Sequence, residues 1–377
     1  MGDAQSSETT EMCTAIRRLS LHPYSKYRIP CPRFNEPFEL LSFSYDGQRK
    51  VRFDDSELKY YFPPIINPPP CLLDGMDTQI RRDHSKNEHI DGLLAALTRR
   101  YSYAPNEFQS DFVMYRGMIT RIFVTPYSAR DSWAMNATKV GSTIYIEDAP
   151  KSQAEEQSDF EQKMTYTGYK FETLCLLDHP THQLRRDGLL DSALLSRSNT
   201  VVDTNREYCS VFRTRLGNHS IISGAEVDCI DQEKPGTAPN RLYRELKTSG
   251  ILDSPRKLEM FERHKLLKFW AQSFIAGIPT VTVGFRDNDG ILHNVEDFRT
   301  QDIPRLVKHK QGMWQANVCM NFAHQVLHFI KKYVVEEGPE MQYRIAYDST
   351  SQEVQISALG KLEPFLTREF LARVARP

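Results

Sequence analysis

The chain has 377 residues, of which 40% are hydrophobic and 26% are charged, and its formal net charge is -1 at pH 7. This composition predicts a soluble globular protein, and the small net charge argues against one that coats nucleic acid through bulk positive potential. No apolar run approaches the ~20 residues needed to cross a bilayer, so no membrane association is expected. The seven cysteines are scattered without a Cys-x-x-Cys pair, which indicates neither a disulfide framework nor a structural zinc site.

The N-terminal part of the chain is expected to be irregular. Residues 1–20 begin rich in Ser, Thr, Glu and Asp and lack clear periodicity, which predicts a disordered tail. They are unlike a secretory signal or a transit peptide, so we expect an intracellular location. The proline-rich residues 61–70 predict an extended loop, and apolar residues at helical spacing then predict a helix over 87–101.

Strand-like segments dominate the middle of the chain and predict a sheet-rich core. They cover residues 112–125, 141–146, 165–176, 207–216, 220–229 and 242–247. The polar residues 151–162 and 184–199 are expected to form surface helices or loops. A stretch with Gly and Pro at residues 231–240 is expected to be a turn, which favours antiparallel pairing between the last two of these strands.

The C-terminal third predicts long helices alternating with strands. Ser254 and Pro255 begin a helix, because serine caps free amides and proline suits the first turn, and Gly277 ends that helix. A strand is expected at residues 278–285, a second long helix at 313–336, and a hairpin from 341–347 and 353–357. We find no internal repeat or long linker, so residues 21–377 are expected to form a single domain of mixed α and β structure, the α/β class.

Two short charged motifs point to a metal-dependent phosphodiesterase site. One is the Glu-x-Asp motif of Glu226 and Asp228, and the other is the Glu-x-Lys motif of Glu245 and Lys247. Because side chains alternate along a strand, each pair lies on one face, and the four side chains converge if the two strands pair. Carboxylates of this kind hold Mg²⁺ or Mn²⁺, and the lysine adds a positive charge beside an attacked phosphate. The alternative is an ordinary pair of strands with acidic residues on the wet face.

Five signatures follow one another in order along most of residues 110–280. They are Tyr115-Arg116-Gly117, Gly168-Tyr169-Lys170-Phe171-Glu172, Gly224-Ala225-Glu226-Val227-Asp228, Glu245-Leu246-Lys247, and the stretch from Phe269 to Gly277. In this set and order the chain resembles the decapping and 5′-end-processing nuclease family, in particular its fungal nuclear members that accompany the nuclear 5′-to-3′ exoribonuclease. The resemblance implies two twisted mixed β-sheets flanked by helices around an Asp/Glu-x-Lys nuclease-like core.

The resemblance also implies a role in metal binding for five residues. Asp228 and Glu245 would be metal ligands, with Glu226 and Glu172 completing the acidic cluster through two ions or their waters. The carbonyl oxygen of Leu246 would be a further ligand. A carboxylate placed among apolar residues, as Glu172 is in the sequence, would be costly to bury without a cation, which favours either a metal or a lysine as its partner.

Substrate binding is implied for a second set of residues, together with Glu172. Lys247 and Gln272 would hold the scissile phosphate, and Arg116 would bind phosphates near the 5′ end through its bidentate fork. Two alternatives stay open, since Arg116 on a strand could pair with a neighbouring acid and Gln272 could serve a helix end. Residues 178–182 (Asp-His-Pro-Thr-His) could be taken for a metal motif, but a plain loop is favoured.

The resemblance implies hydrolysis at RNA 5′ ends by a single catalytic domain. The expected substrates are 5′-triphosphate RNA, which would release pyrophosphate, and RNA with incompletely methylated or NAD-type caps. A role in 5′-end quality control in the nucleus, and a nuclear 5′-to-3′ exoribonuclease as partner, would follow. One alternative is a non-catalytic stabiliser of that exoribonuclease, and another is a DNA endonuclease with the same metal core.

Overall fold

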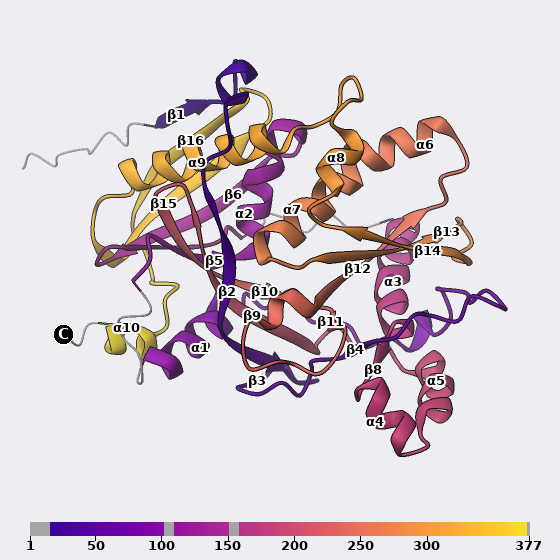
Figure 1. Cartoon of the computed structure of the whole chain (residues 1–377). Coiled ribbons are helices and arrows are strands. Elements are labelled where there is room, and N and C mark those ends of the chain that lie inside the picture. The colour runs from indigo at the N-terminus through magenta and orange to yellow at the C-terminus, as the bar shows by residue number, and fades with distance from the viewer. Residues whose placement is uncertain (1–15, 102–108, 151–157, 375–377) are drawn as a thin grey trace, which may run out of the picture.

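The computed structural model describes residues 16–101, 109–150 and 158–374, and it has mixed α and β structure (Figure 1). Two mixed β-sheets, one of ten strands and one of six, are flanked by helices. This confirms the predicted fold class. In the described parts of the chain, no helix has the length and apolar character needed to cross a membrane.

The ten-stranded sheet has the strand order β1-β16-β15-β6-β7-β5-β10-β9-β2-β3. Its strands are β1 (Arg17–Ser20), β2 (Phe34–Tyr45), β3 (Val51–Arg52), β5 (Phe112–Tyr115), β6 (Trp133–Val140), β7 (Thr143–Asp148), β9 (Glu207–Leu216), β10 (His219–Glu226), β15 (Gly338–Asp348) and β16 (Glu353–Lys361). Most neighbours are antiparallel, but β5 pairs in parallel with both β7 and β10. The predicted C-terminal hairpin is confirmed as β15 and β16.

The six-stranded sheet has the order β14-β13-β12-β11-β4-β8. Its strands are β4 (Tyr60–Tyr61), β8 (Leu176–Leu177), β11 (Cys229–Ile230), β12 (Tyr243–Gly250), β13 (Thr280–Arg286) and β14 (Leu292–Arg299). The predicted turn does produce antiparallel pairing, but only between the short β11 and the start of β12. The preceding strand β10, which carries Glu226, belongs to the other sheet, so the predicted pairing of residues 220–229 with 242–247 is confirmed only at Cys229, opposite Arg244.

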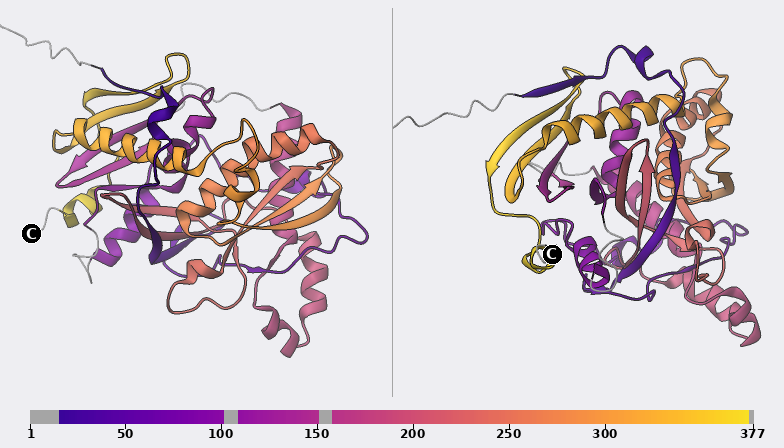
Figure 2. Two further views of the ribbon diagram at one scale, coloured as in Figure 1. Left: turned by 45° about the horizontal axis from the view of Figure 1, so that its top comes forward. Right: turned by 60° about the vertical axis from the view of Figure 1, so that its left-hand side comes forward.

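The helices are α1 (Asp91–Tyr101), α2 (Arg116–Val124), α3 (Asp159–Leu174), α4 (Thr181–Arg186), α5 (Leu190–Asn199), α6 (Pro255–Met260), α7 (Leu266–Ala276), α8 (Ile303–Val307), α9 (Ala316–Tyr333) and α10 (Arg368–Val374). Figure 2 shows α9 lying across the ten-stranded sheet. The helix α2 packs against both α7 and α9, and α3 packs along β12. The α4 and α5 helices extend from the body of the molecule beside β8 (Figure 1).

Two predicted strands are wrong because they are largely helical. Residues 112–125 form β5 only as far as Tyr115, and α2 begins at Arg116. Seven of the nine residues of α2 are buried, and its more exposed side is limited to Gly117 and Arg121, so the apolar run resembles a buried strand. Residues 165–176 belong mostly to α3, which begins with a capping box: the Ser158 hydroxyl accepts from the Glu161 amide, and the Glu161 carboxylate accepts from the Ser158 amide.

Other predicted elements are confirmed near their expected bounds. The Ser254 hydroxyl caps α6 by accepting from the Lys257 amide at 3.3 Å. Gly277 ends α7 with a φ of 72°, a left-handed conformation that suits glycine. A π-helical turn, Phe261–Lys265, joins α6 to α7. Of the predicted tail, residues 1–15 lie outside the described residues, whereas Arg17–Ser20 forms β1 and pairs with β16.

Close packing fixes α3 on the smaller sheet. The Phe171 ring of α3 is fully buried, and it lies against β13 at Gly284. A Cβ atom added at Gly284 would come within 2.5 Å of this ring, so only glycine allows the helix to approach so closely. The position of α3 matters because the next residue along the helix is Glu172.

Candidate active site

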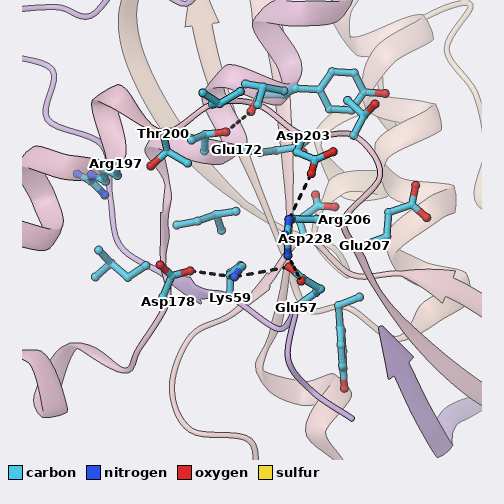
Figure 3. A pocket seen from close by; sticks show the side chains of 18 of the residues that line it. Glu57, Lys59, Glu172, Asp178, Arg197, Thr200, Asp203, Arg206, Glu207 and Asp228 are labelled. Atoms are coloured by element: carbon cyan, nitrogen blue, oxygen red, sulfur yellow. Dashed lines mark hydrogen bonds and ion pairs between the residues drawn. The ribbon is translucent and has the colours of Figure 1, made fainter. Parts of the chain in front are cut away.

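A cavity of about 510 Å³ lies where elements of the two sheets meet (Figure 3). Its walls include residues of β9 and β10 from the larger sheet, of β8 from the smaller sheet, and of the α3, α4 and α5 helices. Three of the predicted catalytic carboxylates, those of Glu172, Glu226 and Asp228, line it. The cavity therefore has acidic groups on its inner surface.

Each of these three carboxylates comes from a different element. Glu172 lies in the last turn of α3, Glu226 is the last residue of β10, and Asp228 lies between β10 and β11. Val227 and Cys229, which alternate with them, are buried apolar residues, but Val227 also lines the cavity. The period-two pattern thus predicted that Glu226 and Asp228 share a site, although the strand pairing differs.

The second charged motif reaches the same cluster from β12. The Lys247 ammonium lies 2.7 Å from Glu245 Oε1 and 3.7 Å from Asp228 Oδ2. Arg116, at the start of α2, lies with Nη1 2.8 Å from Glu245 Oε2. Glu245 is fully buried between these two cations. Arg116 therefore pairs with an acid, which was the alternative left open for it, although from a helix and not from a strand.

The backbone of Leu246 also faces this cluster, while its side chain packs in the core. Its amide donates to Asp228 Oδ2 at 2.6 Å, which fixes this carboxylate against β12. Its carbonyl oxygen accepts from the Lys247 ammonium at 3.1 Å. The carbonyl predicted to be a metal ligand is thus directed toward the same charged group as the carboxylates.

The pKa values divide the carboxylates into two kinds. Burial, together with repulsion from neighbouring carboxylates, raises the pKa of Glu172 well above its ordinary value and raises the pKa of Glu226 and Asp228 to about 7. Burial would also raise the pKa of Glu245, but the Arg116 and Lys247 cations outweigh it and lower this pKa to about 2. Glu245 is therefore held ionised. The ionised forms of the other three carboxylates are destabilised, and a further cation would stabilise them.

The donor chemistry of the cluster fits a hard divalent cation. Among residues 16–101, 109–150 and 158–374, no group of three or more Asp, Glu, His or Cys side chains is already arranged to hold a metal ion. The Lys247 ammonium nevertheless has oxygens of Glu245, Leu246 and Asp228 around it, which shows that these groups converge on a positive charge. Carboxylate and carbonyl oxygens are the ligands that Mg²⁺ and Mn²⁺ prefer.

Gln272 is the one predicted site residue that the structure does not join to the cluster. It is half-buried on α7 and is not among the described residues that line the cavity. Its predicted contact with the scissile phosphate therefore stays a prediction, as does the role of Arg116 in substrate binding.

One wall of the cavity carries a chain of ion pairs that the sequence did not reveal (Figure 3). Lys59 lies 2.8 Å from Asp178 and 3.6 Å from Glu57, and Arg206 lies 2.6 Å from Glu57 and 3.3 Å from Asp203. The acids outnumber the bases, so this wall does not attract phosphate by net charge.

These wall residues come from segments that are far apart in the chain, and no motif marks them. The predicted plain loop at residues 178–182 is only partly correct, because α4 begins at Thr181. Asp178, the first residue of the predicted loop, is the acid that pairs with Lys59.

A buried acidic cluster on two sheets, with a Glu-x-Lys strand at its centre, defines a nuclease of the Asp/Glu-x-Lys class. The model of the RAI1 like PD-(D/E)XK nuclease family matches residues 35–371, and the chain belongs to this family. It is therefore an enzyme, a hydrolase of the nuclease type. This confirms the family that the five signatures indicated.

Relatives and solved structures match over nearly the whole chain. The decapping nuclease RAI1 of Aspergillus fumigatus is 35% identical over 361 residues, which cover 93% of this chain and 96% of the relative. The crystal structure of Candida albicans Rai1 in complex with pU5 and Mn²⁺ matches with a TM-score of 0.86 at 26% identity, covering 96% of this chain and 99% of that one. Scheffersomyces stipitis Rai1 in complex with (3′-NADP)⁺ and a calcium ion matches with a TM-score of 0.83 at 25% identity, covering 95% and 99%.

Proposed function

We propose that this protein hydrolyses phosphate bonds at RNA 5′ ends. Its substrates would be 5′-triphosphate RNA and RNA with incompletely methylated or NAD-type caps, and its role would be 5′-end quality control. The observation that carries the proposal is the convergence of Glu172, Glu226, Asp228 and Glu245 on Lys247 at a cavity between the sheets. The ligands of the related Rai1 structures, a 5′-phosphorylated oligonucleotide and a dinucleotide cofactor derivative, support the same substrate class.

A divalent cation, Mg²⁺ or Mn²⁺ and by expectation a pair of ions, would activate water and stabilise charge on the phosphate when bound. Glu172, Glu226, Asp228 and Glu245, with the Leu246 carbonyl, would hold it. The chain's own residues prepare this site in advance. Two cations keep Glu245 ionised, and the Leu246 amide holds Asp228 in place.

Lys247 supplies the fixed positive charge of the site. Its side chain is 23% accessible, so a phosphoryl oxygen would have a route to it. Burial opposes its charge, but the surrounding carboxylates raise the pKa of Lys247, so it remains an ammonium throughout the physiological range. A charge fixed in a partly buried site stabilises a phosphorane-like transition state more strongly than the same charge in water.

The test is hydrolysis by purified protein of triphosphate, unmethylated-capped and NAD-capped RNAs, each with Mg²⁺, Mn²⁺ or chelator. We expect metal-dependent release of pyrophosphate or of the cap nucleotide. Glu226→Gln and Asp228→Asn should abolish it, whereas Glu233→Gln, at an exposed acid that pairs with His182 at 3.2 Å, should not. Activity that persists in the two site variants would refute the site. Inactivity of the wild type on every 5′ end would favour the non-catalytic stabiliser.

We further propose a nuclear location, a nuclear 5′-to-3′ exoribonuclease as partner, and one catalytic domain over residues 21–377. The family resemblance supports the location and the partner. The single domain is supported by one cluster of buried apolar residues that includes Leu21, Val283 and Phe370 and thus spans both sheets. Co-purification of the tagged protein from nuclear extract would test the partner, and a single cooperative unfolding transition would support the single domain.

A further inference from the structure

Two basic side chains, those of Lys265 and Arg286, are held near the end of β12 by hydrogen bonds to neutral oxygen atoms. The Lys265 ammonium donates to the Thr248 carbonyl at 3.2 Å, and Arg286 at the end of β13 donates from Nε to Thr167 Oγ1 at 3.3 Å and from Nη1 to the Asp287 carbonyl at 3.0 Å. Neither is in an ion pair with a carboxylate among the described residues. Buried cations are normally paired, so this pair is unusual.

The two side chains are withdrawn from solvent to different degrees. Arg286 is only 7% exposed, while Lys265 is half-buried and can be reached from outside. Burial, with a further effect of the Arg286 charge, lowers the pKa of Lys265 to about 8. An anion placed between them would satisfy ammonium and guanidinium donors that now have only neutral acceptors.

Their hydrogen-bond partners lie on β12 and α3, the two elements that carry Lys247 and Glu172. Thr248 follows Lys247 on β12, so the Lys265 ammonium touches the residue next to the catalytic lysine. On α3, Thr167 contacts Arg286 and lies five residues before Glu172, which is about 7.5 Å along the helix axis. Lys265 itself ends the π-helical turn between α6 and α7, a type of irregularity that is frequent at functional sites.

We propose that Lys265 and Arg286 form a second phosphate subsite, which binds a backbone phosphate of the RNA strand whose 5′ end is at the acidic cluster. This inference rests on the proposed RNA substrate. It explains how a chain with net charge -1 can hold a polyanion, because the positive charge is local. It also gives the enzyme a preference for a polynucleotide over an isolated nucleotide.

The test measures binding of 5′-monophosphorylated oligouridylates, a dinucleotide and longer chains, in Ca²⁺ buffer at several salt concentrations. Lys265→Met should weaken binding of the longer chains about fivefold to tenfold, and it should lower the salt dependence by about 0.7 in the logarithmic slope. Binding of the dinucleotide should not change. Lys265→Arg should retain most of the affinity, and Arg286→Met should behave like Lys265→Met. The control is Lys268→Met in the adjoining α7, at an exposed lysine 3.6 Å from Asp131.

The outcomes separate this inference from the proposed function. The subsite would be overturned if wild type and Lys265→Met bound long chains equally. It would also be overturned if Lys265→Met lost as much affinity for the dinucleotide as for long chains, or if Lys268→Met lost as much affinity for long chains as Lys265→Met. If inorganic pyrophosphate inhibited Lys265→Met more weakly than wild type, Lys265 and Arg286 would bind the leaving group, and the backbone-phosphate subsite would again be overturned. A wild type that binds long chains through Lys265 but cleaves none would sustain the subsite while the proposed hydrolysis fails.

Discussion

The buried pair of Arg116 and Glu245 allows a quantitative test of the site's electrostatics. The two side chains are 10% and 0% exposed and lie 2.8 Å apart. Removing one member of a buried pair costs about 3–5 kcal/mol, because the other charge is left without its partner. For Arg116→Met we expect the lower end, about 3 kcal/mol, since Lys247 remains 2.7 Å from the Glu245 carboxylate.

The double variant Arg116→Met/Glu245→Gln removes both charges together. We expect it to be about 2–3 kcal/mol more stable than the sum of the two single effects, which is the coupling free energy of the pair. Urea unfolding in metal-free buffer, followed by the fluorescence of the buried Trp270 and Trp314, measures all four proteins.

A matched exposed pair provides the control for this cycle. Arg241 and Glu36 lie 2.9 Å apart with side chains 66% and 60% exposed, so solvent screens them and their coupling should be far smaller. If the coupling of Arg116 with Glu245 is no larger than that of the control, the two do not form a buried pair. Arg116 would then be free to bind substrate, and its assignment as the partner that keeps Glu245 ionised would be refuted.

Three further predictions concern catalysis, packing and pH. Lys247→Met should slow single-turnover hydrolysis by about 10²-fold or more while its circular dichroism stays native, and a smaller loss would contradict a role in charge stabilisation. Gly284→Ala should lower the free energy of unfolding by about 1–3 kcal/mol, measured with denaturant, because the new methyl group displaces Phe171. Activity should also fall, since Glu172 moves with Phe171. An unchanged free energy of unfolding would show that α3 can shift without cost. Burial lowers the pKa of His219 to about 4, below its unfolded value, so the stability that this group contributes should be lost as pH falls from about 6.5 toward 4. The raised pKa values of Glu226 and Asp228 act in the opposite direction over this range, so the measurement is the difference in unfolding free energy between wild type and His219→Phe. This difference should change as pH falls from about 6.5 toward 4, and a constant difference would argue against the assignment.

The sequence predicted which site residues lie together better than it predicted the elements that carry them. Alternation along a strand placed Glu226 with Asp228 correctly, and the Glu-x-Lys motif placed Glu245 near Lys247. Alternation does not reveal which sheet a strand joins, because side chains alternate with a period of two residues in either sheet. A two-residue strand, β11, is enough to pair with β12 while β10 enters the larger sheet.

The sequence prediction failed at α2 and at α3 for different physical reasons. Most residues of α2 are buried, and its β-branched residues Ile119, Ile122 and Val124 are also typical of a strand. For α3 a usable signal was present, since Ser158 and Glu161 have the spacing of a capping box just before it. The cavity wall was beyond sequence reasoning, because Lys59 meets Asp178 only through the tertiary fold.

The catalytic groups lie on elements from separate layers, and this has a consequence for how the enzyme loses activity. Glu226 ends a strand of the larger sheet, Glu245 belongs to the smaller one, and Glu172 lies on a helix held by the packing at Gly284. No fragment that contains only one layer has a complete constellation. A molecule in which one of these layers has not folded therefore lacks part of the predicted set of catalytic side chains.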